Sequence, residues 1–312
     1  MSTVDRPART LPWTALGVVY VLWGSTYLAN RYIIVSMPPL LASGFRFATG
    51  GLLLGVLVLL VAGRGAFALT RAQLATAALS GLLLPAWGNG LVILAQSQVA
   101  SGLTALLIAS VPLYIAVLRA LTGDRPRPAT VLGVALGAVG LALLVLVGSG
   151  GGAAGVSGSA WWGPPLVLLA GLGWATGTFA TTRMAVPGNP FALATVQQLI
   201  GGAILVVVGT AVGERLHPGA VAPVSWWAWV YMALFVSLGA FSAYAYALAT
   251  LPVSTVATYA YVNPVIAVLL GVLVAGERFS AVQLIGGAVV LLAVVVVIAA
   301  ERRAPPVDAS AP

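Results

Sequence analysis

The chain has 312 residues, of which 61% are hydrophobic and only 6% are charged. A water-soluble domain cannot bury so large an apolar fraction behind so few charges, so this composition excludes a soluble globular protein and indicates one that lies in lipid. The chain contains no cysteine, which excludes disulfides, thiolate metal sites and cysteine nucleophiles.

Apolar runs of about twenty residues recur along the whole chain. A hydrocarbon core about 30 Å thick needs roughly 20 apolar residues per helix, so ten spans fit the length. Continuous apolar character favours helices over the alternating strands of a barrel. We predict an all-α membrane protein with ten transmembrane helices, at 12–34, 40–62, 72–95, 99–121, 129–147, 160–182, 190–212, 224–248, 253–275 and 280–299.

The second half of the chain repeats landmarks of the first. The offsets run from 151 to 153 residues, and the pairs are Trp23 and Trp174, Arg31 and Arg183, Pro39 and Pro190, Pro112 and Pro264, and Gly123-Asp124-Arg125 and Gly276-Glu277-Arg278. An odd number of spans makes the second copy enter the membrane from the opposite side. We therefore expect two inverted five-span repeats, at 1–147 and 160–299, with a Gly/Ser-rich tether at 148–159 and a disordered cytoplasmic tail at 300–312.

All fourteen basic residues are arginines, and their positions predict the orientation. Basic loops stay in the cytoplasm. If both termini are cytoplasmic, three arginines face outward (Arg31, Arg215 and Arg278) and ten lie inside: Arg6, Arg9, Arg64, Arg71, Arg119, Arg125, Arg127, Arg183, Arg302 and Arg303. We expect a multi-pass protein of the plasma (inner) membrane. Single arginines scattered at span ends do not predict nucleic-acid binding.

Several short motifs carry a resemblance to a known family. They are Trp23-Gly24-Ser25, Phe45-Arg46-Phe47, Val111-Pro112-Leu113 with Gly123-Asp124-Arg125, and Asn263-Pro264-Val265 with Gly276-Glu277-Arg278. Together, across both halves, they resemble the EamA family of the drug/metabolite transporter superfamily. The resemblance implies a ten-helix carrier, often an exporter of amino acids, related metabolites or toxic compounds, with spans one to four and six to nine around the cavity.

The two Gly-acid-Arg sequences differ slightly. Asp124 stands where the family more often has Glu, and it comes one residue earlier relative to its proline than Glu277 does. We predict that both sequences form helix-end turns, in which Gly stops the span and the charges lie in interfacial water.

Arg46 lies about six residues into the second predicted span. A charge at that depth is costly unless it has a partner. Two interpretations stay open. Arg46 binds a substrate carboxylate through its planar guanidinium, or it forms a structural ion pair, for instance with Glu277, which the inverted topology puts on the same outer side.

Other polar and aromatic side chains within the spans are candidates to line the substrate pathway. They are Trp23, Thr26, Tyr27, Asn30, Trp87, Asn89, Gln96, Tyr114, Trp174, Thr176, Gln197, Ser242, Tyr244, Tyr246, Tyr259, Tyr261 and Asn263. Pro112 and Pro264 free backbone carbonyls within spans four and nine, and act either as hinges or as static kinks. Gly133, Gly137, Gly286 and Gly287 predict close helix packing of spans five and ten rather than dimerisation.

No acidic residue lies deep in a predicted span, and the only histidine, His217, lies in a loop. Because proton-driven carriers commonly use a buried carboxylate or histidine, we expect a facilitator or exchanger that exports amino acids or related metabolites by alternating access. The alternative is a proton-coupled multidrug efflux carrier; a channel stays open. We expect a monomer or homodimer whose partners are a small-molecule substrate and the lipid bilayer.

An intramembrane serine protease is the competing class, because Gly155-Val156-Ser157-Gly158 resembles the rhomboid serine motif. Linker composition explains the match better, since this sequence lies in the tether, far from His217. We therefore predict that the protein is not an enzyme, with no cofactor and no metal site.

Overall fold

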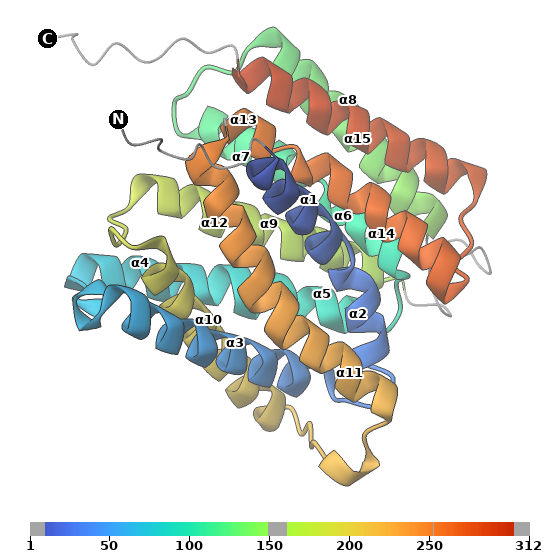
Figure 1. Cartoon of the computed structure of the whole chain (residues 1–312). Coiled ribbons are helices and arrows are strands. Elements are labelled where there is room, and N and C mark those ends of the chain that lie inside the picture. Colours follow the sequence, from blue (N-terminus) through green and yellow to red (C-terminus); the bar gives the residue numbers. More distant parts are fainter. Residues whose placement is uncertain (1–9, 149–160, 252, 303–312) are drawn as a thin grey trace, which may run out of the picture.

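The computed structural model describes residues 10–148, 161–251 and 253–302, and their regular structure is helical throughout (Figure 1). The predicted all-α class is confirmed. The tether from 149 onward and the tail from 303 onward lie outside the described residues, as do Arg6, Arg9 and the Gly155-Val156-Ser157-Gly158 sequence.

Helices occupy each predicted span. In the first half they are α1 (Leu11–Gly24), α2 (Thr26–Ile33), α3 (Pro39–Ala62), α4 (Arg71–Gly81), η2 (Leu82–Asn89), α5 (Gly90–Ala95), α6 (Ser101–Ile108), α7 (Val111–Leu121) and α8 (Pro128–Gly148). In the second half they are α9 (Gly163–Arg183), α10 (Pro190–Ala211), α11 (Pro223–Tyr231), η4 (Met232–Ala240), α12 (Phe241–Thr250), α13 (Val253–Val256), α14 (Tyr259–Ala275) and α15 (Ala281–Arg302). Short 3₁₀ turns, η1 (Arg64–Phe67) and η3 (Pro218–Ala220), lie in two loops.

Seven helical stretches among the described residues are long and apolar enough to cross a membrane. The other three predicted spans hold the α1–α2 pair, α9 and α14, of which α14 is a shorter apolar helix. Together these helices form a multi-pass membrane protein.

Local sequence sets several helix ends. Thr70 and Gln73 form a capping box that begins α4. Gly63 ends α3 with a φ of 71°, and Gly276 ends α14 with a φ of 63°, a left-handed conformation that favours glycine. The predicted role of Gly276 in stopping the span is therefore confirmed.

The second and seventh spans, α3 and α10, pack closely and antiparallel. A Cβ atom at Gly44 would lie 2.7 Å from Val206, and one at Gly55 would lie 3.1 Å from Thr195. Residue numbers rise along α3 as they fall along α10, so the helices run in opposite directions. Glycine is needed here because a side chain would collide with the neighbouring helix.

The fifth and tenth spans, α8 and α15, form a second pair of the same kind. A Cβ atom at Gly133 would lie 2.6 Å from Val297, and one at Gly140 would lie 2.8 Å from Val290. Gly133 faces α15, whereas Gly137 lies against Leu113 of α7, and a Cβ atom there would lie 3.4 Å from Ala293 of α15, so the predicted packing role of these glycines is confirmed within one chain.

Each of these pairs joins equivalent helices of the two halves. Repeats related by an axis along the membrane normal would place equivalent helices parallel, whereas an axis in the membrane plane reverses them. The antiparallel pairing therefore identifies an inverted repeat. In Figure 1 the two pairs lie on opposite sides of the bundle, and the remaining helices fill the space between them.

The spans between these pairs are interrupted. The equivalent segments η2 and η4 in spans three and eight are π-helical, a geometry that is frequent at functional sites. Span one breaks at Ser25, whereas the equivalent α9 is continuous. Pro112 is the second residue of α7, just after the break in span four, and Pro264 lies inside α14. Their role as hinges stays a prediction.

We predict that Gly140→Ala lowers the thermal stability of the detergent-solubilised protein. The new methyl group would meet the backbone of α15 at Gly286 and Val290, and overpacking of this kind costs about 1–3 kcal/mol. The unfolding temperature measures the effect. Gly17→Ala is the matched control, since a Cβ there meets nothing within 4 Å. Equal unfolding temperatures for the two variants would contradict the close packing of α8 on α15.

Candidate functional site

Arg46 of α3 is buried in the bundle, with 3% of its surface exposed. Its Cζ lies 3.9 Å from the centre of the Phe47 ring. The Nε and Nη2 atoms have no hydrogen-bond partner among the residues that the structure describes. Each such buried donor is costly, and it is more costly still on a charged group. Arg46 therefore has unused capacity to bind an anion.

Glu277 does not pair with Arg46, so the proposed ion pair between them is wrong. Glu277 instead accepts a hydrogen bond of 2.6 Å from Nη1 of Arg31 on α2. It also accepts from the backbone N–H and hydroxyl of Ser101, both at 2.8 Å, and from the N–H of Gly102 at 3.0 Å. The carboxylate thus caps α6, where free N–H groups attract negative charge.

This environment also corrects the prediction that Glu277 lies in interfacial water. Its side chain is 2% exposed, because the turn that begins at Gly276 folds back towards α6. The backbone N–H of Glu277 donates to the carbonyl of Gly271 at 2.9 Å, which fixes the turn. The sequence alone indicated Glu277 as an acidic residue in a turn. It did not indicate that Glu277 accepts hydrogen bonds from the N-terminus of α6.

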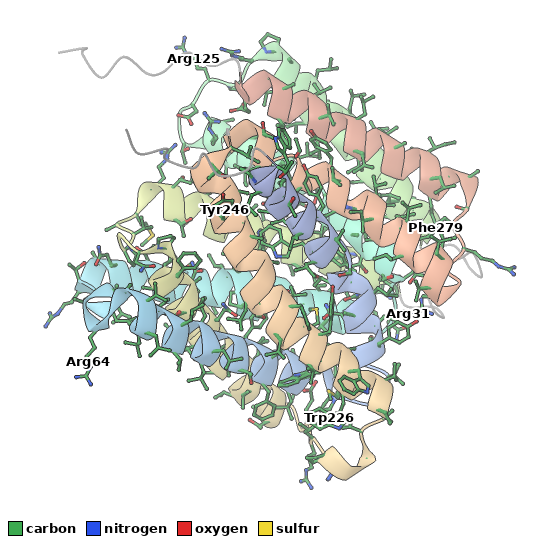
Figure 2. The ribbon with its side chains drawn as sticks, viewed as in Figure 1. Arg31, Arg64, Arg125, Trp226, Tyr246 and Phe279 are labelled. Carbon is green, nitrogen blue, oxygen red and sulfur yellow. The ribbon has the colours of Figure 1, made fainter. Side chains whose placement is uncertain are left out.

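Glu214 makes a similar contact between the halves. Its carboxylate accepts hydrogen bonds from the N–H groups of Leu40 and Leu41, at 3.1 and 2.8 Å, in the first turn of α3. Glu214 and Glu277 therefore both join the second half to helix N-termini of the first, at the same end of the bundle. That end also holds Arg31 (Figure 2).

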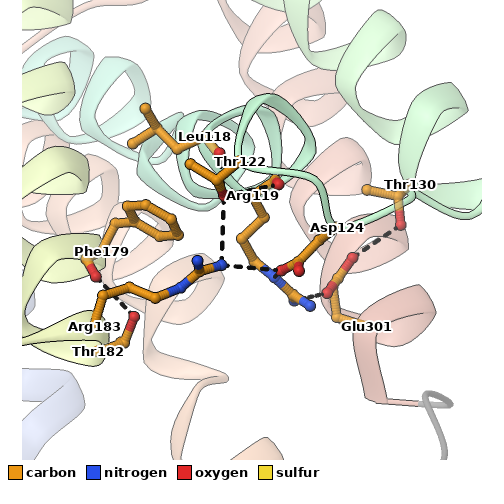
Figure 3. A network of polar contacts seen from close by, with 9 residues as sticks. All are labelled: Leu118, Arg119, Thr122, Asp124, Thr130, Phe179, Thr182, Arg183 and Glu301. Carbon is orange, nitrogen blue, oxygen red and sulfur yellow. Dashed lines mark hydrogen bonds and ion pairs between the residues drawn. The ribbon is translucent and has the colours of Figure 1, made fainter. Parts of the chain in front are cut away.

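Asp124 lies at the opposite end, in a network with arginines (Figure 3). Its Oδ2 accepts from Nε of Arg119 at 2.9 Å and from Nη2 of Arg183 at 3.4 Å. Arg119 also pairs with Glu301 of α15. The hydrogen bond from Arg119 lowers the pKa of Asp124, and the charges of both arginines act in the same direction. The Asp124 side chain is 43% exposed, so the predicted solvated turn fits this residue.

Asn30 and Gln96 form a buried polar contact between spans one and three. The Asn30 amide donates to Gln96 at 3.0 Å, and Gln96 donates to the carbonyl of Tyr27 at 2.7 Å. The Asn30 oxygen has no partner among the described residues, and neither does the Asn263 oxygen. Free acceptors in the interior can receive a hydrogen bond from a ligand.

Gln198 and Ser237 are interior polar residues that the sequence did not indicate as candidates. Both lie against Gly50, one helical turn beyond Arg46, where a Cβ would be 2.8 Å from Gln198 Oε1 and 2.6 Å from Ser237 Cβ. Both amide atoms of Gln198 are unpartnered among the described residues. The predicted Gln197 instead donates to Ser80 at 2.6 Å. The adjacent Gln197 and Gln198 indicated a polar position in this span. The rotation of the helix determines which of the two side chains points into the interior, and the sequence did not reveal it.

Three of the predicted aromatic residues come together from spans one, eight and nine. The centre of the Trp23 ring lies 5.0 Å from the ring centres of both Tyr244 and Tyr259, and the ring centres of the two tyrosines are 5.8 Å apart. Two residues after Trp23, the hydroxyl group of Ser25 lies 2.6 Å from the hydroxyl group of Tyr231.

Other predicted residues contact only the helices around them. Trp87 is 41% exposed and donates to the carbonyl of Leu169, and Trp174 packs at Gly88. Four further side chains bond within their own span or pack on a neighbour: Thr26 to Leu22, Asn89 to Leu84, Thr176 to Leu172, and Tyr114 at Gly171. The side chain of Ser242 lies outside the described part of the structure.

Comparison with known proteins gives a family and a fold. A family model described as the EamA-like transporter family matches residues 12–146 and again 161–299. The protein described as the uncharacterized inner membrane transporter YedA of Escherichia coli K12 is 38% identical over 271 residues, covering 86% of this chain and 84% of the relative. The chloroplastic WAT1-related protein At3g02690 of Arabidopsis thaliana is 28% identical over 286 residues, covering 89% and 67%.

A crystal structure of another protein, 21% identical, covers 95% of this chain and 99% of its own with a TM-score of 0.63, which shows a shared fold. Members of the matched family are transporters rather than enzymes. Two successive matches to one family model agree with the two halves that pack as an inverted repeat. The chain therefore belongs to the EamA-like transporter family.

Proposed function

We propose that the protein is a facilitative carrier or exchanger that exports amino acids or related small carboxylates by alternating access. The observation that carries this proposal is Arg46, a buried guanidinium with two unpartnered nitrogens and no carboxylate among its described contacts. A charge inside a membrane protein marks a functional site by default. A carboxylate matches the planar fork of a guanidinium, so substrate binding would supply the missing partner.

The aromatic group of Trp23, Tyr244 and Tyr259 supports a substrate that also carries an ammonium group. Aromatic faces attract cations, most strongly when both are desolvated. The rings pack within 5.8 Å of one another, in spans that border the interior of the bundle. An amino acid offers both a carboxylate and an ammonium group, and so suits this combination of residues.

The proposed setting is the inner membrane, with both termini in the cytoplasm and a monomer or homodimer as the assembly. Similarity to an inner membrane transporter supports the location. Figure 2 places Arg64 and Arg125 at one end of the bundle and Arg31 at the other. Among the described residues, the first end has Arg64, Arg71, Arg119, Arg125, Arg127, Arg183 and Arg302, and the second has Arg31, Arg215 and Arg278. This imbalance supports a cytoplasmic location of the first end.

The position of the acidic residues supports transport without a proton. In the described part of the chain, Asp124, Glu214, Glu277 and Glu301 all lie at or beyond helix ends and accept hydrogen bonds there. A proton relay commonly needs a carboxylate or histidine within the span. The substrate gradient would therefore drive export.

We predict that Arg46→Met reduces amino-acid counterflow in proteoliposomes by about ten- to a hundredfold, the loss expected for a charge-assisted hydrogen bond. Arg46→Lys should also lose most activity, because an ammonium group cannot bind a carboxylate in the same bidentate geometry. Loss of a buried charge without a counter-ion should leave thermal stability unchanged or higher. Arg71→Met, at an exposed arginine, is the matched control. Normal counterflow in both Arg46 variants would contradict substrate binding by Arg46.

A second prediction concerns energy coupling. With equal substrate on both sides of the membrane, an imposed pH gradient should produce no net accumulation, since no described carboxylate is placed as a proton relay. The assay follows labelled substrate in proteoliposomes with a pH gradient of either sign. Uphill accumulation that collapses with a protonophore would favour proton-coupled efflux instead.

A further inference from the structure

The inverted repeat places one ion pair of the same kind at each end of the bundle. Arg31 and Glu277 form the outer pair, and the equivalent Arg183 and Asp124 form the inner pair. In a perfectly symmetric molecule the two pairs would have the same geometry, because each repeat would contribute the same contacts. In this structure the two pairs differ in distance and in exposure.

The outer pair is tight, and its carboxylate is buried. Its N–O distance is 2.6 Å, and the Glu277 side chain is 2% exposed, whereas the Arg31 side chain is 42% exposed. The same carboxylate caps α6 through Ser101 and Gly102, so a single residue from the second half holds both α2 and α6 of the first. The α2 helix beside it is closed against its neighbours, with Asn30 and Ile33 each 1% exposed.

The inner pair is loose and exposed. Its N–O distance is 3.4 Å, and the two side chains are 47% and 43% exposed. Asp124 bonds more closely to Arg119, at 2.9 Å, which competes with Arg183 for the same oxygen. On α9 and in the turn that follows, Thr182 and Ala185 are exposed, although they correspond to the buried Asn30 and Ile33 of the first half.

We propose that these two pairs are alternating gates, and that the structure holds the state in which the outer gate is shut and the inner gate is released. Opening of the outer end requires Glu277 to leave Arg31 and the N-terminus of α6. In the opposite state the inner pair tightens, and the end of α9 becomes buried as α2 is here. The two halves of an inverted repeat can exchange conformations, and this exchange converts one of these states into the other.

The gate function of Glu277 depends on more than its charge. The Glu277 carboxylate accepts hydrogen bonds from two backbone N–H groups and one hydroxyl. An arginine at this position has only donors, so it could not accept hydrogen bonds from these groups. The charge-swapped variant Arg31→Glu with Glu277→Arg should therefore fail to restore the shut outer gate. A simple surface ion pair would tolerate the exchange.

The chain has no cysteine, so single cysteines can report the exposure of each end without background. We would place Ile33→Cys at the outer end, Ala185→Cys at the inner end, and Val290→Cys in the interface of α8 and α15 as a folding control. The rate of labelling by a charged maleimide in detergent solution is measured for each. The assay needs no substrate, so it is independent of the proposed role of Arg46 and of the membrane orientation.

In the Glu277→Gln background, the cysteine at position 33 should react about tenfold faster, the one at 185 more slowly, and the one at 290 at an unchanged rate. Arg31→Gln should act in the same direction while it leaves the cap on α6 in place. Asp124→Asn, the same change at the equivalent position, should not speed labelling at 33.

Two results would overturn the proposal. An unchanged rate at position 33 in both Glu277→Gln and Arg31→Gln would mean that the outer pair does not hold this end shut. Faster labelling at 33, 185 and 290 together would mean that Glu277 supports the fold as a whole and is not a gate.

Discussion

The close antiparallel packing of α3 on α10 and of α8 on α15 is the constraint on which the rest of the structure depends. In lipid, helices gain little from burying apolar surface against each other, so small residues that allow close approach determine which helices pair. Here glycines on both helix pairs bring backbones together, for example Gly202 against Gly44 and Gly286 against Gly140. Because these pairs join equivalent helices, they fix the two halves as inverted copies around one interior.

Charge is distributed differently at the ends and in the interior of this framework. At the ends, each described carboxylate accepts hydrogen bonds from an arginine, a hydroxyl or a helix N-terminus. In the interior, Arg46 and Gln198 retain donors without partners, and Asn30 and Asn263 retain acceptors. A folded protein rarely leaves such groups unsatisfied unless a ligand, water or ion completes them. This distribution supports the proposals that the ends act as gates and that the interior receives a polar substrate.

The sequence predicted the helical class, seven of the spans, the repeat and its packing glycines, because hydropathy and offset are properties of position along the chain. It could not predict side-chain direction to the same accuracy. Gln197 and Gln198 differ by one position, yet only Gln198 is buried without partners. One step along a helix turns a side chain by about 100°, and uniformly apolar spans give little periodic signal from which to read the rotation.

Contacts between residues far apart in the sequence were the second feature that the sequence could not predict. Glu277 was correctly placed in a turn after Gly276, but its burial depends on α2 and α6. Its contacts with Arg31 of α2 and Gly102 of α6 span 246 and 175 residues of the chain. The break of span one at Ser25 has no counterpart in α9, although both halves share the same landmarks. Such differences agree with the proposed asymmetric state of the two gates, and a repeat in the sequence does not encode them separately.

Counterflow of one matched pair of ligands tests the central claim most directly. Proteoliposomes that contain the unmodified protein would be loaded with an amino acid or with its carboxamide, at equal pH on both sides, and exchange against the labelled amino acid would be followed. If Arg46 recognises a carboxylate inside a carrier, the amino acid exchanges and the amide does so far more slowly. Equal exchange of both ligands would contradict the account, because the interior charge would then make no distinction between them.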